Sequence, residues 1–327
     1  MRPLFFFPQQ KGDTVHTFTI GANDAGQRAD KFLLKACPQM PKSLLYKAFR
    51  KKDIKANGKR IPPETFLQAG DVLQVYLPDD CFAKSAPSAE RQPRLPEPVI
   101  VYEDSDIAIL HKPVNLPVHA DDKGSSDTLI ARFLQHLRDS GAYDPAAEQS
   151  FTPALCNRLD RNTEGLVIGA KNAAALRCIN EKIRSGEIVK EYLCITAGIP
   201  PKPADTVTAY HRRLPGQSAE ISDNPREGFS EIRTGYQVLR TKDGLALMRI
   251  RLYTGRTHQI RVQTAALGCP VLGDMRYGNR AANEKYGFRH QLLCAFRLTL
   301  DFSDTPCPLA HLRGKAWEIT PDFAANF

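Results

Sequence analysis

The sequence predicts a mixed α+β fold in two parts, a small basic N-terminal domain and a larger body. The length of 327 residues suggests two domains. Positive charge gathers near the N-terminus, and a proline-rich stretch separates it from a body rich in short apolar runs of strand length. We therefore expect an N-terminal tail at 1–14, a small domain at 15–80, a linker at 81–98 and the body at 99–327.

Composition and motifs exclude several classes of protein. The eight cysteines lie at least 13 residues apart, so neither a CxxC redox pair nor a zinc-ligand spacing is present. The sequence has no phosphate-binding glycine loop and no Ser-His-Asp order, and His111 and His119 have no further ligand at a suitable spacing. We therefore expect no cofactor and no metal ion.

The sequence also argues against a membrane protein. Its first residues are too few and too proline-rich for a signal peptide, and no apolar run is long enough for a membrane helix. We expect a cytoplasmic protein with reduced thiols and no membrane partner.

The positive charge of the chain lies in one segment. Between Gly26 and Arg60 there are eleven Lys or Arg residues and two acidic residues, so this segment accounts for the whole formal excess of +9. A basic segment attached to a neutral body is typical of a protein that binds a polyanion. The alternative is that these side chains form an ordinary solvated helix face.

Two short helices and a small β-unit are expected in the basic segment. A helix at 30–36 ends before Pro38, and Ser43 is predicted to cap a second helix at 44–52. A strand at 54–56, a turn at Asn57-Gly58 and a strand at 72–77 follow. The proline-rich stretch at 81–98 is predicted to be semi-extended, and the body begins with a hairpin formed by 99–102 and 107–110.

The first of three motifs in the body is NRLDRNTEG at 157–165. It precedes an apolar strand predicted at 166–170, so Asp160 lies on a loop that leads into the core, where functional side chains are common. Alternatively, Asp160 forms an Asx-turn or a salt bridge with a neighbouring arginine.

The second motif, Lys190-Glu191-Tyr192, leads into a strand predicted at 192–197. Tyr192 is either an ordinary strand aromatic or a surface on which a base stacks.

The third motif is TGRTHQIR at 254–261, after a strand predicted at 244–253. Thr257 is expected to cap a helix at 258–267 that ends at Gly268. Arg261 would then lie near the positive end of the helix and point into a site that contains an anion. A buried pair with Asp160 would satisfy both groups and keep Asp160 ionised. The alternative is a surface arginine.

The three motifs, with Tyr192 32 positions after Asp160 and Arg261 a further 69, resemble the RluA-type family of RNA pseudouridine synthases. The stretch YEDSDIAILHKPVNLPVH at 102–119 is similar to the start of the same catalytic domain. The pattern RADKFL … PKS … KKDIKANGK … AGDVLQVYL resembles the αL RNA-binding domain named after ribosomal protein S-four. The resemblance covers about 21–323. Five residues depart from the family pattern: Asp53 stands in place of glycine, Asn157, Gln263 and Cys294 in place of histidine, and Glu164 in place of serine.

The resemblance implies a body built on a large, mostly antiparallel sheet, with the three motifs meeting in a cleft. It implies that the protein isomerises uridine to pseudouridine, with Asp160 as the nucleophile, Tyr192 stacked on the uracil and Arg261 paired with Asp160. Attack on the base and attack on the sugar both fit these residues. Arg158 would fill the gap that the flipped uridine leaves in the RNA, and Leu293 would line the uracil pocket. The other residues implied are Thr163, His258 and Gln259 for the substrate, and Arg28, Lys42, Lys47, Arg50, Lys51, Lys52, Lys55 and Lys59 for RNA.

The expected partner is structured RNA, with ribosomal RNA first and transfer RNA as the alternative, and the protein is expected to be a monomer. The GDMRYG segment at 273–278 is predicted to form a turn, and Cys294 to be a packed hydrophobe. A second hypothesis is an RNA-binding or ribosome-assembly protein that lost activity through the departures from the family pattern. Because Asp160, Tyr192 and Arg261 are all present, the sequence favours the enzyme.

Overall fold

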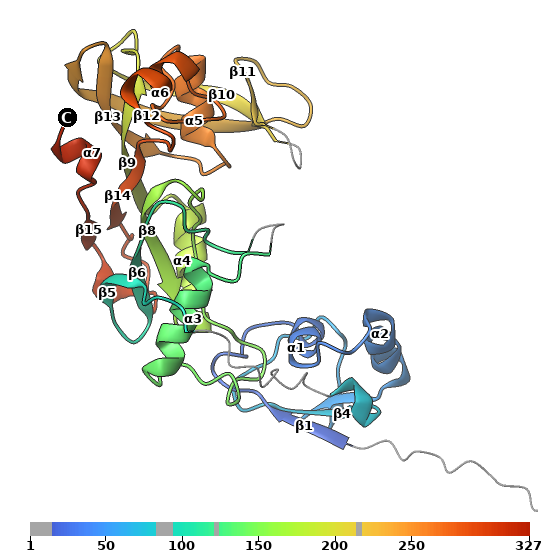
Figure 1. Cartoon of the computed structure of the whole chain (residues 1–327). Coiled ribbons are helices and arrows are strands. Elements are labelled where there is room, and N and C mark those ends of the chain that lie inside the picture. The colour runs from blue at the N-terminus through green and yellow to red at the C-terminus, as the bar shows by residue number, and fades with distance from the viewer. Residues whose placement is uncertain (1–14, 83–93, 121–123, 214–217) are drawn as a thin grey trace, which may run out of the picture. The chain divides into compact units, whose positions relative to one another are not determined.

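The computed structural model describes residues 15–82, 94–120, 124–213 and 218–327, shown in Figure 1. The chain divides into two compact units. Unit 1 contains Met1–Arg94 together with Asp144–Thr152, and unit 2 contains Leu95–Tyr143 and Pro153–Phe327. The expected tail at 1–14 and most of the expected linker, 83–93, lie outside the described residues.

Unit 1 packs two helices on a four-stranded antiparallel sheet with the order β1-β4-β2-β3. Its core is formed by the apolar faces of both helices and the inward side chains of the strands, with Phe32, Leu33 and Leu45 fully buried. The elements are β1 (Val15–Thr19), α1 (Ala29–Ala36), α2 (Lys42–Lys51), β2 (Ile54–Ala56), β3 (Lys59–Arg60), β4 (Val72–Tyr76) and η1 (Asp79–Cys81).

The start of α2 differs from the sequence prediction. The helix begins at Lys42 with Pro41 as its N-cap, so Ser43 lies inside the first turn and caps nothing. Pro41 has φ −62° and ψ 138°, the extended conformation that a proline ring tolerates directly before a helix. The proline therefore sets the boundary, and the helix does not need a side-chain cap there. At the other end, Lys52 ends the helix in the left-handed region with φ 69°.

The segment 144–152 belongs to unit 1 although it lies far along the sequence. Asn23 donates a hydrogen bond to Glu148, and Gln27 donates one to Ser150. These side-chain contacts attach the segment to the loop before α1.

Unit 2 is built on an eleven-stranded sheet and confirms the predicted α+β class. The strands run in the order β11-β10-β12-β13-β9-β14-β8-β6-β5, while β15 pairs with β14 and β7 with β8. Among the described strands every pairing is antiparallel except that of β14 with β8. The strands are β5 (Val99–Glu103), β6 (Ile107–Lys112), β7 (Ala154–Leu155), β8 (Glu164–Ala170), β9 (Ile188–Ala197), β10 (Ala204–Arg212), β11 (Glu220–Ser222), β12 (Ser230–Lys242), β13 (Leu245–Leu252), β14 (Leu293–Leu300) and β15 (Ala316–Glu318).

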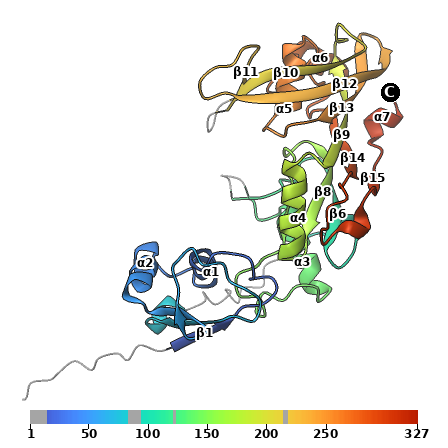
Figure 2. The same cartoon turned by 180° about the vertical axis from the view of Figure 1, so that it is seen from behind.

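The helices of unit 2 lie beside different halves of this sheet. Figures 1 and 2 show α3 and α4 with β6 and β8, and α5 and α6 with β10, β12 and β13. The strands β9 and β14 lie between the two halves of the sheet. Side chains from distant parts of the sequence therefore meet along these two strands. The helical elements are α3 (Leu129–Asp139), α4 (Ala173–Arg184), α5 (Gln259–Ala266), α6 (Arg280–Tyr286), η2 (Ala310–Leu312) and α7 (Asp322–Ala325).

Among the described residues, none of the helices combines the length and apolar character that crossing a membrane requires.

Candidate active site

A cleft of about 750 Å³ in unit 2 brings together the three sequence motifs. Asp160 comes from the loop before β8, Tyr192 from the middle of β9, and Arg261 from the first turn of α5. Leu293, the first residue of β14, lines the cleft beside Tyr192. The order of the strands explains the meeting, because β9 and β14 are neighbours and β14 also pairs with β8.

A buried lysine stabilises the Asp160 loop through hydrogen bonds to backbone carbonyls. Lys112, at the end of β6, is fully buried, and its ammonium donates to the carbonyls of Pro113, Leu116 and Arg161 at 2.8–2.9 Å. Burial lowers the pKa of Lys112 to about 8, against the opposing effect of the Asp160 and Glu164 charges. All three donors of the ammonium are used, so Lys112 fixes the backbone next to Asp160. Lys112 was not among the residues predicted from the sequence; its position directly after an apolar strand was the available signal.

Asp160 forms the predicted pair with Arg261. Arg261 Nη1 donates to Asp160 Oδ2 at 2.7 Å. The other edge of the guanidinium is bound by Asp274, with Nε to Oδ2 at 2.6 Å and Nη2 to Oδ1 at 2.9 Å. Asp274 is 1% exposed and Arg261 8% exposed, whereas the Asp160 side chain keeps 25% of its exposure. The arginine is therefore anchored on the buried acid and presents one nitrogen to the accessible acid.

The electrostatics of this group favour full ionisation of Asp274 and Arg261. Burial raises the pKa of Asp274, but the hydrogen bonds and charge of Arg261 outweigh it and hold the pKa below its usual range. Burial likewise lowers the pKa of Arg261, but the hydrogen bonds and charges of Asp274 and Asp160 raise it overall. Asp274 also accepts the backbone N–H groups of Arg276 and Tyr277, which confirms the turn predicted at 273–278. The predicted turn thus carries the anchor for Arg261.

The start of α5 differs from the sequence prediction. The helix begins at Gln259, and its N-cap is His258 in the left-handed region with φ 60°, not Thr257. The imidazole contacts the Tyr277 hydroxyl through Nδ1 at 2.9 Å, and its Nε2 lies 3.8 Å from Asp160 Oδ2. Burial lowers the pKa of His258 to about 4, although the Asp160 charge opposes this shift. The imidazole is therefore neutral near pH 7.

The side chain of Gln259 forms all its hydrogen bonds within the protein. Its Oε1 accepts from the Thr254 hydroxyl and the Arg256 N–H, and its Nε2 donates to Arg233 O and the Thr234 hydroxyl. These four bonds use the donors and acceptors of the amide, so Gln259 orders the TGRT loop, while its contact with the substrate stays a prediction.

Tyr192 and Leu293 give the cleft an apolar wall. Tyr192 is 6% exposed and packs in the same cluster as Leu293 and Ile260. Burial, with the Asp160 charge, raises the pKa of Tyr192 above its usual range, so the phenol stays protonated. Behind this wall Cys294 is fully buried, and burial raises the pKa of its thiol. Cys294 is a packed side chain, as predicted, and not a thiolate.

The other predicted substrate residues occupy two different settings. Arg158 is exposed and lines the mouth of the cleft. Thr163 lines the same cleft but is 2% exposed, with its hydroxyl accepting from Gln291 and its backbone N–H bonded to Asp160 O. Arg158 is available to a ligand, whereas Thr163 mainly shapes the Asp160 loop.

Three departures from the family pattern have hydrogen-bond partners of their own. Asn157 accepts the N–H of Ile168 at 2.8 Å and so continues the pairing of β7 with β8. Glu164 accepts from His111 Nε2 at 2.8 Å. Gln263 accepts from the Thr234 hydroxyl and donates to Val207 O. None of the three side chains displaces Asp160, Tyr192 or Arg261 from the cleft.

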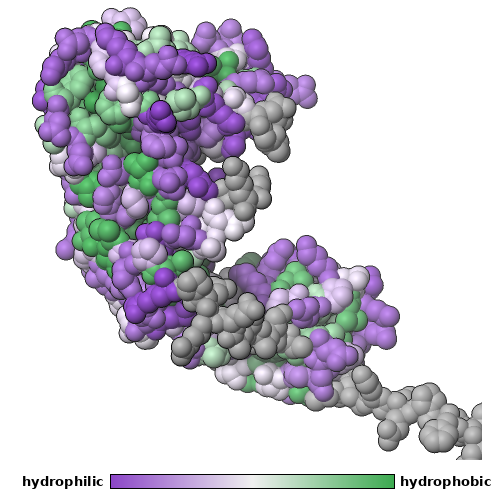
Figure 3. Space-filling model, viewed as in Figure 1, coloured by the Kyte–Doolittle hydropathy of each residue, from purple (hydrophilic) through white to green (hydrophobic). Residues whose placement is uncertain are grey.

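The basic residues of unit 1 lie mostly on its surface. Six of the eight predicted RNA-binding residues, Lys42, Lys47, Arg50, Lys51, Lys52 and Lys59, are exposed. Figure 3 shows hydrophilic side chains along the outer edge of α2. Lys55 lies over the Tyr76 ring at 4.8 Å. Arg28 is committed differently, since its Nε and Nη2 bind the buried carboxylate of Asp30.

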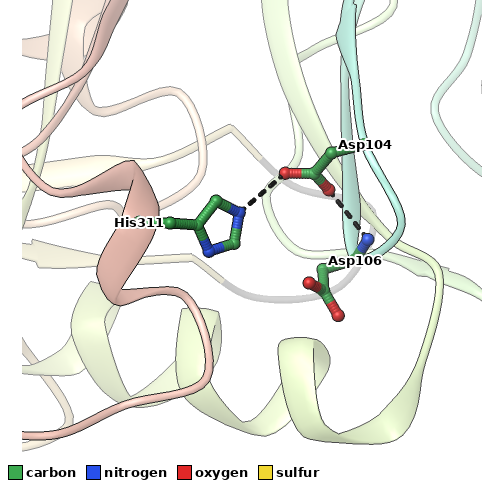
Figure 4. A group of neighbouring side chains, drawn as sticks. All are labelled: Asp104, Asp106 and His311. Carbon is green, nitrogen blue, oxygen red and sulfur yellow. Dashed lines mark hydrogen bonds and ion pairs between the residues drawn. The ribbon is translucent and has the colours of Figure 1, made fainter.

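One group of side chains in the described part of unit 2 has the spacing of metal ligands, namely Asp104, Asp106 and His311 (Figure 4). The Asp104 carboxylate accepts the N–H groups of Asp106 and Ile107 through Oδ1, and the Tyr102 hydroxyl and His311 through Oδ2. These four bonds use its lone pairs and form the turn between β5 and β6. The hydrogen bonds of Asp104 therefore fit the capping of a hairpin better than the binding of a cation.

The chain is similar to known proteins of one family. The family model described as RNA pseudouridylate synthase matches residues 106–266. The chain is 31% identical to the ribosomal large subunit pseudouridine synthase C of Haemophilus ducreyi, over 83% of this chain and 82% of the relative. It is 34% identical to the proteins of the same name from Salmonella typhimurium, over 83% and 82%, and Escherichia coli, over 82% and 81%.

Solved structures support the same fold. Human RNA pseudouridylate synthase domain containing 4 superposes with a TM-score of 0.55 at 24% identity, covering 69% of this chain and 90% of that one. Human RNA pseudouridylate synthase domain containing 1 gives 0.52 at 24% identity, covering 69% and 84%. With its sequence relatives and its fold in agreement, the chain belongs to the RNA pseudouridylate synthase family and is a pseudouridine synthase.

Proposed function

We propose that this enzyme isomerises uridine in ribosomal RNA of the large subunit, with Asp160 as the nucleophile. The observation that carries the proposal is the state of the Asp160 carboxylate. Its Oδ2 is held by Arg261 at 2.7 Å, Oδ1 has no hydrogen bond within the described parts of the chain, and Asp160 lines the cleft. The names of the relatives support large-subunit ribosomal RNA as the substrate.

The reaction is an isomerisation, so no co-reactant is consumed. The bond between N1 of uracil and C1′ of ribose breaks, the base rotates, and a bond forms between C5 and C1′. The proton on C5 is lost and N1 gains one. A carboxylate supports these steps by forming and then releasing a covalent bond to the substrate. The Arg261 contact would keep the Asp160 carboxylate aimed at the substrate.

The other side chains of the cleft would bind the flipped nucleotide. Tyr192 and Leu293 offer a flat apolar wall for the uracil. The exposed Arg158 would enter the RNA stack at the position that the uridine has left. His258, neutral near pH 7, would help to shape the pocket through its contact with Tyr277. Extruding a base costs a few kcal/mol and is least costly in loops and bulges, which favours structured RNA with an accessible uridine.

Unit 1 would add affinity rather than chemistry. Its resemblance to the S-four-type domain and its exposed basic side chains support contact with the phosphate backbone. Such contacts do not distinguish base sequences, so the choice of uridine would be made in the cleft.

Tritium release tests the proposal directly. Large-subunit ribosomal RNA transcribed with tritium at C5 of uridine is incubated with the wild-type protein and with Asp160→Asn. We expect release from the wild type and none from the variant, because the amide is not a nucleophile. Comparable release by both proteins would remove Asp160 from the mechanism. Mapping pseudouridine in RNA from cells with and without the protein then identifies the uridine, and a transfer RNA site alone would overturn the ribosomal assignment.

A further inference from the structure

Lys190 faces the same cleft as Tyr192, two residues earlier on β9. Successive side chains of a strand point to opposite faces, so Lys190 and Tyr192 share one face and Glu191 takes the other. Glu191 accepts from Arg249 Nε at 2.8 Å on its own face, while Lys190 and Tyr192 both line the cleft. The Lys-Glu-Tyr motif thus places an ammonium beside the aromatic wall.

The ammonium of Lys190 has no partner within the described parts of the chain. Its side chain is half-buried, and desolvation lowers its pKa. Other shielded lysines of unit 2 are satisfied: Lys112 donates to three carbonyls, and Lys182 pairs with Glu187 at 2.6 Å. Partial shielding removes some of the hydration of an unpaired ammonium, so an anionic ligand in the cleft would be a favourable partner for Lys190.

The charge of the cleft indicates what that ligand is. Asp160 is the one carboxylate among its described lining residues, and that group is already paired with Arg261. Gly255 lies next to Lys190, since a Cβ atom at this glycine would be 3.5 Å from Nζ, an ordinary van der Waals distance. An anion for Lys190 must therefore come with the substrate. The cationic lining residues are Arg158, Arg184, Lys190, Arg251, Arg256 and Arg261.

We propose that Lys190 binds a phosphodiester oxygen of the nucleotide whose uracil stacks on Tyr192. This assignment rests on the proposed function of the cleft. Side chains two residues apart on a strand are separated by about 7 Å, which is comparable to the distance between the base and the phosphate of one nucleotide. Lys190 would thereby set how far the flipped nucleotide enters, and it would hold C1′ next to Asp160.

Binding of RNA without turnover tests this role. In the Asp160→Asn background, filter binding to a transcript of large-subunit ribosomal RNA is measured over a range of salt with and without Lys190→Met. We expect weaker binding and a fall of about 0.7–0.9 in the slope of log Kd against log salt, the loss of one phosphate contact. Lys315→Met, which removes an exposed lysine outside the cleft, should leave both quantities unchanged.

Chemical substitution in the RNA sharpens the result. A hairpin carrying the mapped uridine is made with a neutral methylphosphonate at each phosphate flanking that uridine. One of these methylphosphonate substitutions should weaken RNA binding by the protein that keeps Lys190, but it should not weaken binding by the Lys190→Met variant. If Lys190→Met weakens binding with an unchanged salt slope, the lysine contacts a neutral group such as a uracil carbonyl, and the proposal fails.

A stability measurement separates binding from folding. Because Lys190 is shielded and unpaired, Lys190→Met should keep or raise the Tm of the protein, whereas Lys112→Met should lower it. A clear fall in Tm for Lys190→Met would make the residue structural and overturn the proposal. Since these assays need no turnover, their failure is distinguishable from a failure of Asp160 as the nucleophile.

Discussion

Asp274 binds two nitrogens of the Arg261 guanidinium, at 2.6 Å and 2.9 Å, and leaves Nη1 to contact Asp160. The buried acid therefore sets the orientation of the arginine, and the arginine positions the accessible acid. Asp274 is not among the described residues that line the cleft, so its effect on the site passes through Arg261. It is a positioning residue.

Replacing Asp274 by asparagine should impair both folding and turnover. The variant leaves Arg261 without its buried counter-charge, so we expect the free energy of unfolding of unit 2 to fall by about 3 kcal/mol. Misplacing Asp160 should also reduce kcat by about 10²-fold, with a smaller effect on KM. Urea unfolding is followed by the fluorescence of Trp317, the single tryptophan, and turnover by tritium release. Asp205→Asn, which breaks the exposed pair with Lys202, should change neither.

Gly165 is required where β8 pairs with β14. Its φ is +136°, and a Cβ atom there would lie 2.5 Å from atoms of Ala295. Gly165→Ala should therefore lower the free energy of unfolding by about 3 kcal/mol, because the backbones of β8 and β14 cannot move apart without breaking the sheet. Gly141→Ala is the matched control: its φ is +73° with open space around it, so only backbone strain of about 1 kcal/mol is expected. Equal effects in the two variants would contradict the steric argument.

The stability of unit 2 should depend on His258 in mildly acid solution. The folded pKa of about 4 lies below the ordinary value of 6.5, so the unfolded chain takes up a proton first as the pH falls. The His258 contribution is complete above pH 6.5 and is lost as the pH falls toward 4, by at most about 3 kcal/mol. His258→Gln should flatten the stability profile between these pH values when both proteins are unfolded by urea. An unchanged slope would show that folding does not shift the pKa of His258.

The pair of Glu164 and His111 should be energetically coupled. Both side chains are about one quarter exposed and lie 2.8 Å apart, Nε2 to Oε1. A double-mutant cycle with Glu164→Ser and His111→Gln, measured by urea unfolding near pH 6, should give a coupling of about 1 kcal/mol. Additive losses would mean that Glu164 is tolerated without help from His111.

The sequence alone determined the local parts of this protein. Strand periodicity, glycine turns and the hairpin formed by 99–102 and 107–110 depend on neighbouring residues, so they can be predicted directly from the sequence. The three motifs likewise identified Asp160, Tyr192 and Arg261 as candidates. Two helix starts were predicted wrongly: Pro41 and His258 act as N-caps where Ser43 and Thr257 were expected. At both helix starts the backbone geometry outweighed the side-chain preference.

Only the tertiary structure decided how these residues are supported. Asp274 binds Arg261, and Lys112 binds the backbone of the Asp160 loop. Glu164 pairs with His111. Each contact joins segments that are separated in the sequence. The physical reason is that a buried charge needs a partner, and the partner is chosen by strand order and register, not by proximity in the chain. Sequence spacing could name the reacting side chains, whereas the packing of β8, β9 and β14 set their geometry.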